Sequence, residues 1–137
     1  MSGKPPRNQV TGPAQVRFYF DTDVLGLAHV VAGLRADATC PGDPGATIGG
    51  RRRPKCPITD TNVLDSDWIP KVAANGWTIS TRDARIERRP AERQAVVNYD
   101  AEMFVITSRG NLSKWDQLEV LMSRWRQIDE QAGRPRP

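Results

Sequence analysis

The sequence predicts an α/β fold in which helices cover both faces of a mainly parallel, four-stranded sheet, as a three-layer sandwich. Short apolar segments alternate along the chain with stretches of helical spacing, and this alternation is typical of parallel strands joined by right-handed crossovers. The chain of 137 residues is long enough for one core but too short for two enzymatic halves. We therefore expect one compact α/β domain.

Strands and helices follow from the spacing of apolar residues and from glycine and proline positions. We expect strands at Val16–Phe20, Ala36–Cys40, Trp77–Ser80 and Met103–Thr107. Helices are expected at Val24–Arg35, Ser66–Asn75, Pro90–Val97 and from Ser113 onward. The segments Pro41–Gly45 and Gly49–Pro54 are rich in glycine and proline, so they are expected to be loop only.

The last expected helix has an apolar stripe, and the two ends of the chain do not. At helical spacing the stripe contains Trp115, Leu118, Leu121, Met122, Trp125 and Ile128. Both tryptophans are therefore expected in the core. The polar ends predict a disordered lead-in at 1–14 and a disordered tail at 132–137, with the folded domain at 15–131.

Basic residues outnumber acidic ones and are clustered. There are 20 Lys and Arg against 16 Asp and Glu, a formal net charge of +4. One cluster comprises Arg51, Arg52, Arg53 and Lys55, and the other comprises Arg82, Arg85, Arg88, Arg89 and Arg93. Either cluster could be a solvated face, but the second begins beside an acidic residue, Asp83. A basic surface next to carboxylates indicates a polyanionic substrate.

The cysteines and the histidine do not favour a zinc site. Cys40 and Cys56 flank the glycine-rich segment without a second cysteine near either, and His29 lies in the apolar first helix, where we expect it to pack. A disulfide between the two cysteines is possible. With no signal peptide and no apolar run long enough for a bilayer, we expect no membrane contact, a cytoplasmic location and reduced thiols.

Acidic residues follow the expected strands. Asp21 and Asp23 come directly after the first strand, Asp83 follows the third, and Asp65 precedes the second helix. Because parallel strands end at one edge of the sheet, these carboxylates are expected to lie close together. Carboxylate oxygens suit Mg²⁺ or Mn²⁺, which would also relieve their mutual repulsion. Asp23 and Asp65 could instead be helix N-caps.

The segment from Asp65 to Asp83 resembles the hallmark of PIN-domain nucleases: an acid, a helix that ends at a glycine, a strand, and then Thr-x-Asp. Together with the strand that ends at Asp21, the chain resembles the compact PIN-like domain of VapC-type toxins. The similarity extends over most of Val16–Ile128. Unlike longer family members, this chain has no glutamate between Asp21 and Asp65.

The resemblance implies a metal-dependent endoribonuclease that is the toxin of a toxin–antitoxin pair. It implies catalytic roles for Asp21, Asp65 and Asp83, and a cation, Mg²⁺ or Mn²⁺, held by these residues and Asp23. We expect four residues to bind the RNA: Thr81, Arg82, Arg85 and Arg89. A cognate antitoxin would be the protein partner, and the family also forms homodimers, for which the last helix offers an apolar face.

Two other functions compete with this interpretation. The segment Phe20–Leu25 resembles the first motif of haloacid-dehalogenase-type phosphatases, but the strand that ends at Thr107 lacks the acidic pair those enzymes need. The other alternative is a non-catalytic PIN-like module that binds RNA or protein, in which the acids only cap helices. The missing glutamate keeps that alternative open.

Overall fold

A computed structural model describes residues 12–60, 65–82, 102–106 and 113–133 of the chain. Its central sheet has four strands, in the order β3-β2-β6-β7, and all of its pairings are parallel. The strands are β3 (Ala38–Thr39), β2 (Phe18–Phe20), β6 (Thr78–Thr81) and β7 (Glu102–Val105). The expected α/β fold with a four-stranded parallel sheet is thus confirmed.

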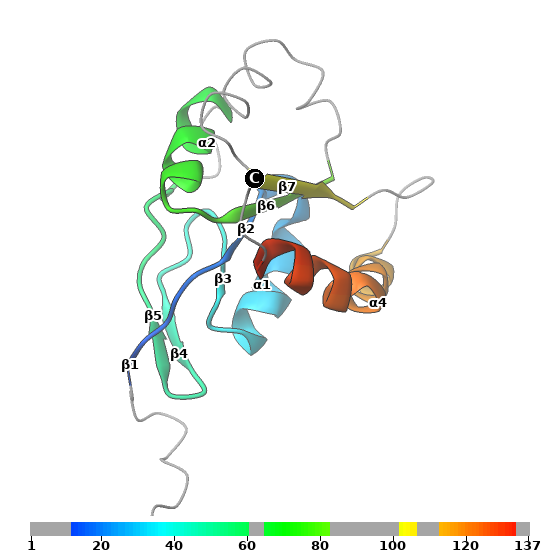
Figure 1. Ribbon diagram of the computed structural model, residues 1–137, viewed down its shortest axis with the longest axis horizontal. Coiled ribbons are helices and arrows are strands. Elements are labelled where there is room, and N and C mark those ends of the chain that lie inside the picture. Colours follow the sequence, from blue (N-terminus) through cyan, green and yellow to red (C-terminus); the bar gives the residue numbers. More distant parts are fainter. Residues whose placement is uncertain (1–11, 61–64, 83–101, 107–112, 134–137) are drawn as a thin grey trace, which may run out of the picture.

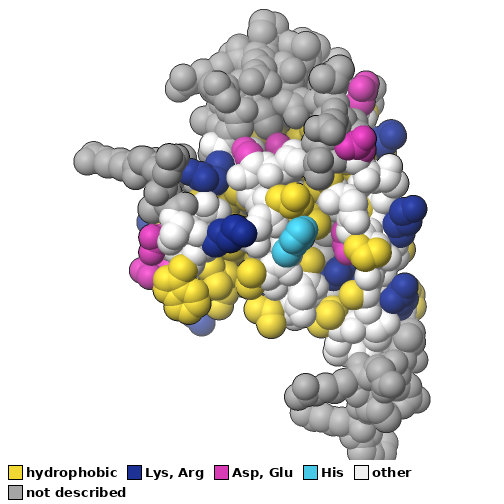
Figure 2. All heavy atoms as spheres, turned by 180° about the vertical axis from the view of Figure 1, so that it is seen from behind, with side chains coloured by type: hydrophobic (Ala, Val, Ile, Leu, Met, Phe, Trp, Pro, Cys, Tyr) yellow, Lys and Arg dark blue, Asp and Glu magenta, His cyan; other side chains and the backbone are white. Residues whose placement is uncertain are grey.

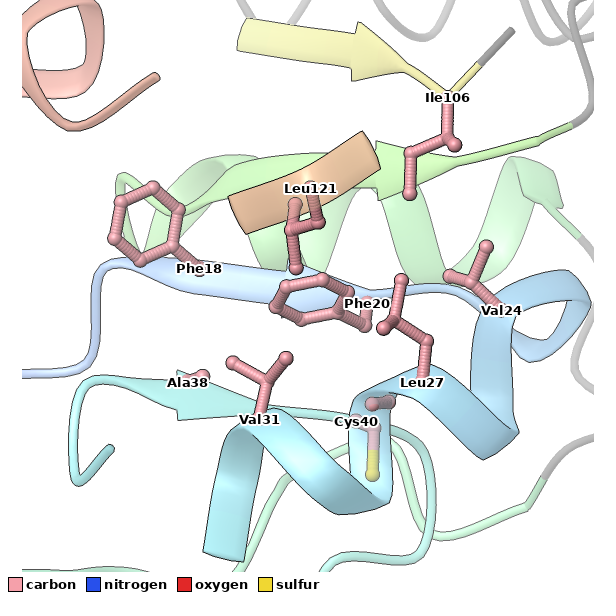
Figure 3. Packing of buried hydrophobic residues seen from close by; sticks show 10 residues of the cluster. Phe18, Phe20, Val24, Leu27, Val31, Ala38, Cys40, Ile106 and Leu121 are labelled. Atoms are coloured by element: carbon pink, nitrogen blue, oxygen red, sulfur yellow. The ribbon is translucent and has the colours of Figure 1, made fainter. Parts of the chain in front are cut away.

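Helices cover both faces of this sheet, which gives three layers (Figure 1). The helices are α1 (Leu25–Leu34), α2 (Asp65–Ala74) and α4 (Lys114–Gly133). Successive side chains of a strand point to opposite faces, so Phe18 and Phe20 pack against α1 and α4 with Leu121 (Figure 3). Tyr19 points the other way and packs against α2. The segment Phe18–Phe20 is therefore apolar throughout because both of its faces are buried.

A second, smaller sheet lies beside the main one, in the order β1-β5-β4. Its strands are β1 (Gly12–Pro13), β4 (Ala46–Ile48) and β5 (Arg51–Arg53). The antiparallel pair β4–β5 corrects the expectation that this region is loop only. Gly49 and Gly50, with φ of 57° and 81°, form the two-residue turn, because tight hairpins favour positive φ at both positions. The parallel pairing of β1 with β5 also gives part of the expected lead-in a defined structure.

A buried ion pair fixes the hairpin β4–β5 to the main sheet. Arg53 Nε donates to Asp43 Oδ2 at 2.6 Å, and both side chains are almost fully buried. Arg53 Nη1 also donates to the carbonyl oxygens of Ala32 and Arg35, at 2.9 and 3.0 Å, near the end of α1. Thr39 Oγ1 donates to Asp43 Oδ2 at 2.7 Å. We call Thr39, Asp43 and Arg53 the hairpin anchor. Arg53 is therefore not part of a solvated basic surface, contrary to the expectation for its cluster.

The structure corrects two further expectations about single side chains, those for His29 and Trp115. His29 is exposed, because the buried stripe of α1 follows positions 27, 28, 31 and 32. Trp115 is 75% exposed, whereas Trp125 is half buried, as expected for a core residue, and contacts Phe18 with tilted rings whose centroids are 4.8 Å apart. Figure 2 shows the histidine on a face where hydrophobic and basic side chains are interspersed.

Several elements lie close to their expected positions, and others cannot be compared. The helix expected from Ser66 begins at Asp65, and the strand expected from Met103 begins at Glu102. The helix expected at Pro90–Val97 lies outside the described residues. Among the helices of the described chain, none has the length and hydropathy needed to cross a membrane.

Candidate functional site

The carboxyl ends of β2 and β6 place Asp21 beside the end of β6. The backbone N–H of Asp21 donates to the carbonyl oxygen of Ser80 at 2.9 Å, which extends the strand pairing to the last residue before the turn. The side chain of Asp21 is 6% exposed. Its Oδ1 accepts the backbone N–H of Thr22 at 2.7 Å and the Thr22 hydroxyl at 3.0 Å. Asp21 is thus held rigidly where the main chain turns.

Asp21, not Asp23, is the cap at this turn. A short 3₁₀ helix, η1 (Thr22–Val24), precedes α1, and the Asp21 side chain caps its first N–H. The residue before α1 is Val24, which makes no side-chain cap. The possible role of Asp23 as the N-cap of the first helix is therefore wrong. A cap of this kind satisfies a helical N–H that has no partner within the helix.

Asp23 instead joins η1 to the end of β6. Its Oδ2 accepts a hydrogen bond from the Thr81 hydroxyl at 2.7 Å and another from the backbone N–H of Arg82 at 2.9 Å. Thr81 is fully buried, whereas Asp23 is exposed. Residues that are 58 positions apart in the sequence are thereby tied together. The hydroxyl of Thr81 therefore orients the carboxylate of Asp23. We call Asp21, Asp23 and Thr81 the carboxyl edge.

The side chains of two of the four expected carboxylates, Asp65 and Asp83, lie outside what the structure describes. Asp65 is the first residue of α2, and only its backbone is described. Because a short loop at 75–77 joins the end of α2 to the start of β6, the helix runs opposite to the strand. Asp65 consequently lies at the helix end nearer the carboxyl ends of the strands. Asp83, Arg85 and Arg89 lie outside the described residues, and β6 ends two positions before Asp83.

The oxygen atoms at the carboxyl edge are of a type that suits a hard cation. A carboxylate offers about four acceptor positions, so the two hydrogen bonds to Asp23 leave capacity for a metal ion. No group of three or more potential metal-binding side chains occurs among the described residues. The described side chains include neither that of Asp65 nor that of Asp83. The full metal site therefore remains a prediction, and its described half fits that prediction chemically.

Thr22 was not assigned by the sequence pattern, whereas Ser80, like Thr81, was a possible donor to a carboxylate or phosphate. The Asp-Thr pair at 21–22 was the only local signal for Thr22, since threonine hydroxyls often bond to neighbouring carboxylates and backbone groups. Ser80 pairs in register with Phe20, so its side chain lies on the α1 and α4 face. Ser80 Oγ is buried and makes no hydrogen bond within the described part of the chain. Ser80 therefore contributes its carbonyl oxygen to the site, through the bond from Asp21.

The chain matches a known protein family. A family model described as a PIN-like domain matches residues 17–108, which is more than half of the chain. The matched range contains all four expected carboxylates and the whole parallel sheet. Neither the curated proteins nor the solved structures gave a match.

Proposed function

The chain belongs to the family of PIN-like domains, and from this premise we propose that it is a metal-dependent endoribonuclease acting at the carboxyl edge. The observation that carries the proposal is the placement of two carboxylates at the ends of neighbouring parallel strands. Asp21 follows β2, and Asp23 is bonded to the end of β6 by Thr81. Ligand sites of open parallel sheets lie at this end of the strands.

Asp21, Asp65 and Asp83 are proposed to hold Mg²⁺ or Mn²⁺, with Asp23 as an auxiliary ligand. A divalent cation bound there would activate water and neutralise charge on the scissile phosphate. The protein's own contribution is to fix the acids in place. Asp21 is fixed by Thr22, and Asp23 is fixed by Thr81 and by the backbone of Arg82.

Arginines near the end of β6 are proposed to bind the RNA backbone. Arg82 is half buried directly after Thr81, and Arg85 and Arg89 follow it in the sequence. A guanidinium group can donate two parallel hydrogen bonds to phosphate oxygens. In the sequence these arginines adjoin Asp83. We therefore propose that one phosphodiester contacts the arginines and the metal-binding carboxylates together.

We also propose that the protein is a VapC-type toxin that a cognate antitoxin inhibits and that can form homodimers. The support is an apolar surface on α1 and α4, where Leu34, Trp115 and Met122 are 71%, 75% and 65% exposed. A groove of about 200 Å³ between these helices is lined almost entirely by apolar side chains. Exposed apolar patches of this kind are typical of protein interfaces.

The test is cleavage of a mixed pool of structured RNAs by the wild type and by Asp83→Asn and Asp21→Asn, with Mg²⁺, Mn²⁺ or EDTA. We expect discrete cuts that require the metal and vanish in both variants. Glu119→Gln, which removes an exposed carboxylate from α4, is the matched control and should cleave normally. RNA that stays intact under every condition would contradict the nuclease and favour the non-catalytic module. Hydrolysis of a small phosphomonoester with intact RNA would favour the phosphatase.

A further inference from the structure

A groove of about 640 Å³ lies at the opposite end of the sheet from the carboxyl edge. Its walls come from the residues before β2, from the end of α1 and the residues after it, and from the hairpin β4–β5. The lining residues that matter here are Pro13, Arg17, Leu34, Arg35, Ile48 and Arg51. Its volume falls in the range of small-molecule sites, and its walls combine guanidinium groups with apolar side chains.

Two of the three guanidinium groups in this groove are already neutralised. Arg35 makes two hydrogen bonds to Asp37, each 2.9 Å long, and the bond to Asp37 raises the pKa of Arg35. Arg17 Nη1 lies 2.6 Å from Asp129 Oδ1 and 3.6 Å from Asp37 Oδ2. Arg51 is exposed and makes no ion pair with any carboxylate among the described residues. Within the described part of the chain, Arg51 is therefore the one cation of the groove that no carboxylate neutralises.

The hairpin holds Arg51 in position. Arg51 and Arg53 lie on the same side of β5 because they are two residues apart, and Arg53 is fixed by the hairpin anchor. On the other side of the strand lies Arg52, which does not line the groove. β1 braces β5, since the N–H of Ala14 donates to the carbonyl oxygen of Arg52 at 2.8 Å. The guanidinium of Arg51 covers Gly12, where an added Cβ would lie 2.8 Å from Arg51 Nη1.

We propose that this groove is a second RNA-binding site, which takes one nucleotide of a single strand outside the cleavage site. Arg51 donates to a phosphate oxygen, and the base rests on the apolar side chains of Leu34 and Ile48. The choice of RNA as the ligand rests on the proposed ribonuclease function, because the groove and the carboxyl edge would bind the same strand. The groove and the carboxyl edge lie at opposite ends of the central strands, so only an RNA longer than a few nucleotides can reach both.

The test is a comparison of Arg51→Ala with Arg52→Ala. Both variants remove one exposed arginine from the same strand, and the net charge changes equally. Only the first residue lines the groove. Binding of a fluorescent single-stranded RNA is measured by anisotropy in EDTA at several salt concentrations, so that neither cleavage nor the metal affects the result. Urea unfolding midpoints of both variants verify that the fold is intact.

We expect Arg51→Ala to weaken binding about tenfold, as for the loss of one charge-assisted hydrogen bond. Its plot of log affinity against log salt should lose about one unit of slope, as for one phosphate contact. Arg52→Ala should weaken binding less than about twofold. Equal losses in the two variants, or no loss in Arg51→Ala, would overturn the site. Because the measurement uses EDTA, failure of the proposed nuclease activity would leave this comparison unchanged.

Discussion

The carboxyl edge and the hairpin anchor both contain a buried or partly buried aspartate held by hydrogen bonds, but the two are built differently. In the hairpin anchor, Asp43 is paired with a buried cation, Arg53, at 2.6 Å. At the carboxyl edge, Asp23 accepts hydrogen bonds from the Thr81 hydroxyl and the backbone N–H of Arg82, and Asp21 accepts two from Thr22. The anchor neutralises its charge internally, whereas the hydrogen bonds that Asp23 accepts within the described part of the chain come from neutral groups.

We interpret this difference as one between a structural aspartate, Asp43, and proposed functional ones, Asp21 and Asp23. A buried carboxylate with its own arginine has no need of a further ligand, and its role is to connect elements. A carboxylate that is oriented by neutral groups, as Asp23 is within the described part of the chain, can pair with an added cation, and we propose that role for Asp23. The comparison therefore predicts large stability effects at the anchor and mainly functional effects at the carboxyl edge.

The largest stability effect is expected for Asp43→Ala, which leaves the Arg53 guanidinium buried without its carboxylate. Loss of one partner of a buried pair costs about 3–5 kcal/mol of unfolding free energy. Urea denaturation followed by tryptophan fluorescence measures this loss. The double variant Asp43→Leu with Arg53→Met should recover much of it, because no charge is then buried. A loss below about 1 kcal/mol for Asp43→Ala would show that the anchor does not hold the hairpin.

The cysteines beside the anchor should react slowly in the folded protein. Both are free and buried, and the N–H of Cys56 donates to the Asp43 carbonyl oxygen at 3.0 Å. Burial raises the pKa of the Cys40 thiol from 9.0 to about 11, and burial also raises the pKa of Cys56. At pH 8 the Cys40 thiolate should be about 100-fold scarcer than in the unfolded chain. Alkylation by iodoacetamide, with and without guanidinium chloride, measures the difference.

The same shift predicts how stability changes at alkaline pH. The thiol of Cys40 is protonated in the folded state up to a higher pH than in the unfolded state. Its contribution to stability is therefore complete below pH 9 and is lost as the pH rises to about 11. Urea midpoints should fall more over this range in the wild type than in Cys40→Ala. An equal fall in both proteins would contradict the burial of this thiol.

Thr81→Val should have a smaller effect on stability and a clear effect on the site. The variant keeps the side-chain shape but removes the hydrogen bond to Asp23, which costs about 1 kcal/mol. Because the Thr81 hydroxyl donates to Asp23, we now expect Thr81 to orient that carboxylate for the metal and not to bind RNA as the sequence predicted. Cleavage should therefore slow while RNA affinity in EDTA stays unchanged. Thr47→Val in β4 is the control and should alter neither. Normal cleavage by Thr81→Val would remove Thr81 from the site.

The smallest effect is expected at the surface pair of Arg17 and Asp129. Their ion pair is 2.6 Å long, but the side chains are 31% and 45% exposed. Water and salt screen such a pair, so Asp129→Ala should cost less than about 1 kcal/mol. Urea unfolding at low and high salt measures this loss. A loss as large as that of Asp43→Ala would show that burial does not distinguish the two pairs.

Local patterns were sufficient for the parallel sheet and its helices, but not for the hairpin. The strands near Phe18 and Thr78 and the helices near Leu25 and Asp65 follow from apolar spacing. The strand Arg51–Arg53 has no apolar residue, and its stability depends on partners distant in sequence, namely β1 and Asp43. The Gly49-Gly50 pair was the available hairpin signal.

Helical spacing also could not decide which side chains of a helix would be covered. Trp115 and Trp125 share the apolar face of α4, yet only Trp125 meets the sheet, through Phe18. At the candidate site, the apolar pattern placed Asp21 directly after a strand, as the structure does, and its role as a metal ligand stays a prediction. The bond between Asp23 and Thr81 could not be foreseen, because it depends on how η1 folds against β6.

The most direct test of a cation site at the carboxyl edge is calorimetric titration of Mn²⁺ into the wild type and Asp21→Asn. The asparagine keeps an oxygen to accept the N–H of Thr22, so the cap is retained while the charge is lost. We predict binding in the millimolar range or tighter for the wild type, no detectable binding for Asp21→Asn, and normal binding for the control Glu119→Gln. Equal Mn²⁺ binding by the wild type and Asp21→Asn would contradict the site.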